Sequence, residues 1–77
     1  MATKISADTV DSAIFTNLLV LHELLLNAAL RVGEARQWLE QEGRKSAIGS
    51  MLGVDASLDE AKHLYGTVLV LHRKASQ

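Results

Sequence analysis

The sequence predicts an all-α fold, and three observations lead to that prediction. The 77 residues contain no proline, no segment of strand length alternates between apolar and polar residues, and apolar residues recur at helical spacing. A chain of this size forms one domain at most, with a marginal core. We therefore expect a single domain over residues 1–77, with flexible ends at 1–7 and 75–77. We also expect a small helical bundle that dimerisation completes as a four-helix core.

A long first helix is predicted over about residues 9–42. Asp8 and Asp11 can accept hydrogen bonds from the free amides of its first turn. Gly33 lies inside this helix at a cost of about 1 kcal/mol relative to alanine. Gly43 is expected to stop the helix by adopting a left-handed conformation.

The segment Ala13–Leu30 of this helix is apolar nearly all round. One heptad stripe has the spacing of a coiled coil and consists of Ile14, Leu18, Leu21, Leu25, Ala28, Val32, Ala35 and Leu39. A second stripe consists of Phe15, Leu19, Leu26 and Leu30, which leaves Thr16, Glu23 and Asn27 as a thin polar strip. A helix this apolar is normally covered on most sides, and so short a chain has little with which to cover it. The pattern indicates a second copy of the chain or a partner protein.

Two shorter helices are predicted after Gly43. One runs over about 47–52, with Ser46 as its N-cap. The other runs over about 58–74, because Ser57 and Glu60 have the spacing of a capping box.

Composition excludes several functional classes. The chain has no cysteine, which rules out disulfides and thiolate metal sites and favours a cytoplasmic location. The net charge is −1, and the basic residues are scattered, which argues against nucleic-acid binding. His22 and Glu23 interrupt the apolar run at its middle, which argues against a membrane span.

Enzymatic sites are not evident in the sequence. There is no phosphate loop and no recognisable nucleophile setting, so we expect no enzyme, no catalytic residues and no cofactor. A helix-turn-helix over residues 46–65 is one alternative, but Asp55, Asp59 and Glu60 would repel phosphates. A metal-binding bundle is another alternative, built on Glu23 and the Glu60-x-x-His63 motif. His63 points away from the apolar face, however, so we expect no metal site.

We predict an oligomer interface on the apolar side of the first helix, formed by Ile14, Asn17, Leu18, Leu21, Leu25, Leu26, Ala28 and Val32. Asn17 either fixes the register across that interface or bonds locally. Trp38 either anchors a partner or packs under the short second helix. His22 and His72 fall within apolar arcs, where each is either half-buried with a partner or part of a pH-sensitive interface.

These observations favour a small non-enzymatic helical interaction protein. It would act as a regulator, adaptor or chaperone of a protein partner and would associate with itself through the apolar side of the first helix. A transcriptional regulator and a metal-binding bundle are the alternative functions.

Overall fold

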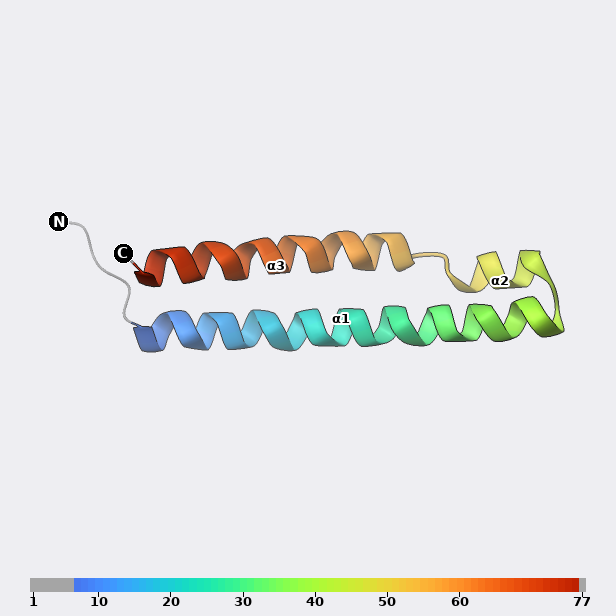
Figure 1. Ribbon diagram of the computed structural model, residues 1–77, viewed down its shortest axis with the longest axis horizontal. Coiled ribbons are helices and arrows are strands. Elements are labelled where there is room, and N and C mark those ends of the chain that lie inside the picture. The colour runs from blue at the N-terminus through green and yellow to red at the C-terminus, as the bar shows by residue number, and fades with distance from the viewer. Residues whose placement is uncertain (1–6, 77) are drawn as a thin grey trace.

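Residues 7–76 form an elongated helical hairpin in the computed structural model, which describes these residues and no others. Helix α1 spans Ala7–Gln41, α2 spans Arg44–Ser50 and α3 spans Val54–Ser76. Both α2 and α3 pack against α1 and follow one another along its length (Figure 1). The molecule measures 62 × 16 × 13 Å. The described residues include no strand, so the all-α prediction is confirmed.

Helix α1 is continuous through Gly33 and ends one residue before the predicted limit. The amides of Glu42 and Gly43 donate to the carbonyl oxygen of Trp38 at 2.7 and 2.9 Å. Gly43 has a φ of +105°, a conformation that favours glycine. The predictions of one long helix and of a glycine stop at this position are confirmed. The expected flexible N-terminal segment, apart from Ala7, lies outside the described residues.

The predicted starts of α2 and α3 are wrong, and the reason is the same for both. α2 begins at Arg44 directly after Gly43, so Ser46 lies inside the helix and does not cap it. α3 begins at Val54 directly after Gly53, whose φ is +94°. Each glycine turns the chain within very few residues, and the next helix starts at once.

The predicted capping box at the start of α3 is also absent. The amide of Ser57 donates to the carbonyl oxygen of Gly53 at 3.1 Å, which is a helical hydrogen bond four residues back. Ser57 therefore lies within the first turns of α3 rather than at its N-cap. At the other end, α3 continues through Ala75 to Ser76, beyond the predicted limit at about residue 74.

Small side chains form the contact between α1 and its two partner helices. The buried apolar residues are Val10, Ala28 and Ala35 of α1, Ala47 of α2, and Val54 and Ala61 of α3. Ile14, Leu21 and Leu24 lie on the same side of α1 and are half-buried. We call this side, from Val10 to Ala35, the inner face of α1.

The surface area is large for the mass. A compact monomer of 8.4 kDa would expose about 4,600 Å², whereas this chain exposes 6191 Å². The hairpin contributes to this excess of about 1,600 Å², because its two layers cover each helix on one side only.

Two glycine substitutions test the end of α1 at Gly43 and its continuity through Gly33. They are expected to change the free energy of unfolding in opposite directions. Gly43→Ala is expected to lower the free energy of unfolding by about 1 kcal/mol, because alanine is strained at positive φ. Gly33→Ala is expected to raise it by up to about 1 kcal/mol, because a Cβ at Gly33 meets no atom within 4 Å and alanine favours a helix interior. Chemical denaturation followed by circular dichroism measures both. A Gly43→Ala protein as stable as the Gly33→Ala protein would contradict the assigned turn.

The close approach of α3 to α1 can be tested at Ala61, which is 5% exposed. Ala61→Leu is expected to lower the free energy of unfolding by about 1–3 kcal/mol, because the larger side chain overpacks the contact. Ala56→Leu, at an exposed position of the same helix, is the matched control and is expected to change it by less than about 0.5 kcal/mol. Equal unfolding free energies for the two variants would contradict the packing.

Candidate interaction surface

One side of the hairpin carries a continuous row of exposed apolar side chains. We call it the open face; on α1 it consists of Phe15, Leu18, His22, Leu25, Ala29 and Val32, all of them exposed. Successive members are three or four residues apart, so they lie on one side of the helix. Phe15 is 63% exposed and Leu25 is 45% exposed, large fractions for side chains of this size. Within residues 7–76 the open face therefore lacks a cover.

Shallow grooves join the open face to the neighbouring helices. A groove of about 550 Å³ between α1 and α3 is lined by Leu25, Ala28, Ala29, Val32, Gly33, Arg36, Val54 and Leu58. An apolar hollow farther toward the N-terminus of α1 is lined by Phe15, Leu18, Leu19, Leu21, His22 and Leu25. A third groove between α1 and α2 includes Val32, Leu39 and Ile48. Leu25 and Val32 belong to more than one groove, so the three form one strip along the hairpin.

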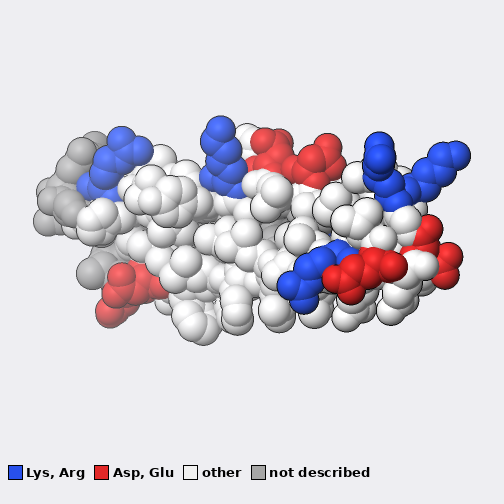
Figure 2. Space-filling model, turned by 45° about the vertical axis from the view of Figure 1, so that its right-hand side comes forward, with Lys and Arg blue, Asp and Glu red and all other residues white. Residues whose placement is uncertain are grey.

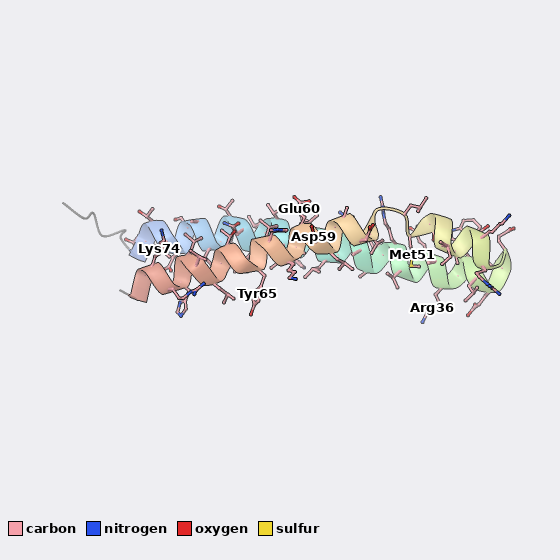
Figure 3. All side chains as sticks on the ribbon, turned by 90° about the horizontal axis from the view of Figure 1, so that it is seen from above. Arg36, Met51, Asp59, Glu60, Tyr65 and Lys74 are labelled. Atoms are coloured by element: carbon pink, nitrogen blue, oxygen red, sulfur yellow. The ribbon has the colours of Figure 1, made fainter. Side chains whose placement is uncertain are left out.

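The figures show the same division of the surface. In Figure 2 a broad area without charged groups occupies the middle and lower left of the molecule, and charged groups lie along its upper edge, at its ends and in front at the lower right. In Figure 3 Tyr65 and Arg36 extend from one edge of the hairpin, whereas Glu60 lies toward the opposite edge. Tyr65 follows Leu58 by seven residues on α3, so the open face includes part of both helices.

The opposite side of the hairpin is polar. Thr16, Glu23 and Asn27 are exposed there, as the predicted polar strip requires. A groove on this side is lined by Leu24, Asn27, Ala28, Leu30, Arg31, Glu34 and Ser57. The Nη1 atom of Arg31 donates to the carbonyl oxygen of Leu52 at 2.7 Å, which ties the turn before α3 to α1.

The structure divides the predicted interface residues into two groups. Ile14, Asn17, Leu21 and Ala28 are buried or half-buried on the inner face, toward α3 of the same chain, whereas Leu18, Leu25, Leu26 and Val32 are exposed. The heptad stripe in the sequence thus combines members of two adjacent faces, because α3 covers only one of them. Leu26 lies beyond the open face, on an outer flank shared with Leu19 and Leu30.

Asn17 and Trp38 each had two interpretations, and the structure bears on both. The Nδ2 atom of Asn17 donates to the carbonyl oxygen of Ala13 at 2.8 Å, so the asparagine bonds locally within α1. Trp38 is 41% exposed. Trp38 is therefore partly accessible to a partner, and its two interpretations stay predictions.

The two histidines of the apolar arcs are exposed in the single chain, and whether an interface covers them stays a prediction. His22 lines the apolar hollow together with Phe15 and Leu25. α3 covers the inner face of α1 and leaves the flank with His22 exposed. The periodicity of α1 alone does not reveal which flank a second helix covers. The pH-sensitive interface stays a prediction.

The residues of the alternative sites are not assembled in the structure. Within residues 7–76, no group of three histidine, aspartate or glutamate side chains is placed to hold a metal ion. The Nδ1 atom of His63 lies 3.9 Å from Oδ2 of Asp59, and both side chains are exposed. Because α2 and α3 pack against α1 and not against each other, residues 46–65 lack the packed helix pair of a helix-turn-helix.

Comparison with known proteins adds nothing to this geometry: no protein-family model, curated protein or solved structure matches the chain. Among the described helices, the one over Asp8–Gln41 is long and apolar enough to cross a membrane by length and composition, and 6% of its most apolar part is buried. A helix exposed to this extent needs a cover of protein or lipid.

Proposed function

We propose that this protein is a non-enzymatic helical interaction protein that associates with itself through the open face and regulates, adapts or chaperones a protein partner. The observation that supports the proposal is the continuous apolar strip from Phe15 to Val32. Monomeric soluble proteins rarely expose apolar patches of such extent unless another molecule covers them.

The energetics of burial favour self-association. Removing a leucine, valine or phenylalanine side chain fully from water is worth about 1.5–3 kcal/mol, and Phe15, Leu18, Leu25 and Val32 each retain 45% or more of their exposure. Covering these four in two copies therefore supplies several kcal/mol.

Two features favour a protein cover over a lipid cover. The polar side of α1 carries Glu23, Arg31 and Glu34, so it lacks the lysine-rich face that anionic membranes attract. The inner face already packs against a helix whose exposed residues include Asp59, Glu60 and Lys62, which a hydrocarbon environment would penalise. Flotation with anionic vesicles tests the lipid alternative directly; protein that floats as a monomer would contradict our proposal.

A second surface remains for the protein partner after self-association. Leu26 and Leu30 on the outer flank are about half exposed and line none of the open-face grooves. Helices of partner proteins commonly bind apolar stripes of this spacing. Trp38, farther along α1, is of the residue type most often found to anchor such contacts.

Changing Leu25 to lysine tests the proposed self-association. Leu25→Lys is expected to weaken dimerisation by at least tenfold, because it places a charge at the centre of the open face, where burial of an unpaired charge costs more than about 1.4 kcal/mol. Asn27→Lys is the matched control, with the same added charge on the polar strip two residues away. Sedimentation equilibrium over a range of concentrations measures both. Equal dimer affinities for the two variants would contradict the assigned face.

The pH dependence of association tests the role of His22. Histidine gains its charge between pH 8 and pH 5, and a charged imidazole against apolar side chains is penalised. The dimer is therefore expected to be favoured at pH 8 and to weaken as the pH falls toward 5. His22→Leu is expected to abolish most of this dependence, and His63→Leu, at an exposed position remote from the open face, is expected to retain it. Equal masses for the wild-type protein at pH 5 and pH 8 would exclude the effect.

A further inference from the structure

The open face of α1 has the same spacing when it is read from either end. Extended by one charged residue at each end, it consists of Asp11, Phe15, Leu18, His22, Leu25, Ala29, Val32 and Arg36. Successive intervals are four, three, four, three, four, three and four residues. All eight side chains are exposed, and the grooves described above connect the apolar ones. A stripe with this symmetry fits a reversed copy of itself.

We infer that two copies of the chain pair through antiparallel α1 helices, with the two-fold axis passing between His22 and Leu25. This inference rests on the proposed self-association and specifies its geometry. Antiparallel helices pack in layers in which one position of the heptad meets the other. The layers are then Phe15 with Val32 of the second copy, Leu18 with Ala29, and His22 with Leu25.

Residue size and charge are complementary in this register. The two outer layers each join a larger side chain to a smaller one, Phe15 to Val32 and Leu18 to Ala29, which favours interdigitated packing. At both ends Asp11 of one copy meets Arg36 of the other, and within residues 7–76 neither side chain forms an ion pair. A parallel pairing would instead place Asp11 against Asp11 and Arg36 against Arg36. The charges therefore select the antiparallel arrangement.

The arrangement also accounts for α3. Leu58 lines the same groove as Leu25 and Val32, so α3 of each copy lies beside the α1 pair and its open-face residues approach the second hairpin. Two hairpins packed in this way form a four-helix bundle. Leu26 and Leu30 of the outer flank stay accessible on both sides of the dimer.

Charge reversal at Asp11 and Arg36 tests the register. In the Asp11→Arg variant two guanidinium groups meet at each end of the dimer, and in the Arg36→Asp variant two carboxylates meet there. Each single variant is expected to dimerise about tenfold more weakly than the wild type at low salt, because two attractive contacts become repulsive. The double variant Asp11→Arg/Arg36→Asp restores opposite charges at both ends and is expected to regain wild-type affinity within about twofold. These differences in affinity are expected to shrink as the salt concentration rises, because salt screens the interactions between exposed charges.

Mixing the two single variants gives a sharper result. The heterodimer of Asp11→Arg with Arg36→Asp has an attractive pair at each end, so it is expected to form in preference to either weakened homodimer. Sedimentation equilibrium of the separate and mixed proteins measures all of these affinities, and circular dichroism checks that each variant keeps the wild-type helix content. Arg36→Gln and Asp11→Asn, which remove charge without reversing it, are expected to weaken association by less than the reversals do.

The outcomes separate this inference from the proposed function. Dimers of unchanged affinity in every charge variant would overturn the antiparallel register and leave self-association standing. Single variants that match the wild type while the mixture binds more tightly would indicate parallel α1 helices and would also overturn it. A wild-type protein that stays monomeric at every concentration tested would contradict both proposals.

Discussion

The close contact between α1 and α3 through small side chains is the constraint on which the rest of the structure depends. Ala28, Ala35 and Ala61 are almost fully buried, so the two helix backbones approach closely there, and Leu21 and Leu24 of the inner face are half-buried. Most of the other large apolar residues of α1 lie on its other sides. In this protein the usual distribution is reversed, because the smallest side chains are the most buried and many of the largest are exposed.

In the dimer that we propose, this reversal would couple folding to association. A contact whose fully buried residues are alanine and valine removes less apolar area from water than a core of buried leucine does, and burial of apolar area is the main favourable term in folding. The hairpin as a monomer therefore has a small margin of stability. Covering the open face adds the burial that a core of leucine and phenylalanine supplies within larger domains. The same side chains would then both stabilise the fold and bind the second copy.

The sequence predicted the elements well where a residue acts through its own backbone conformation. Gly43 ended α1 as expected, and α1 continued through Gly33 because one glycine costs too little to break a helix of this length. The capping predictions at Ser46 and Ser57 failed because serine also occurs within helices, and the positive φ of Gly53 had already turned the chain. Cap motifs indicate where a helix is able to start, whereas the backbone turn decides where it does.

The candidate surface was predicted in outline, and its division required the tertiary structure. Helical periodicity established that α1 is apolar around most of its circumference and polar at Thr16, Glu23 and Asn27, because side-chain direction on a helix follows from position alone. Periodicity did not reveal which apolar stripe faces α3. That choice depends on the packing of two helices far apart in the sequence, and it places Leu21 on the inner face and Leu25 on the open face. The open face exists because one helix can cover only one side of another, which no pattern within a single segment records.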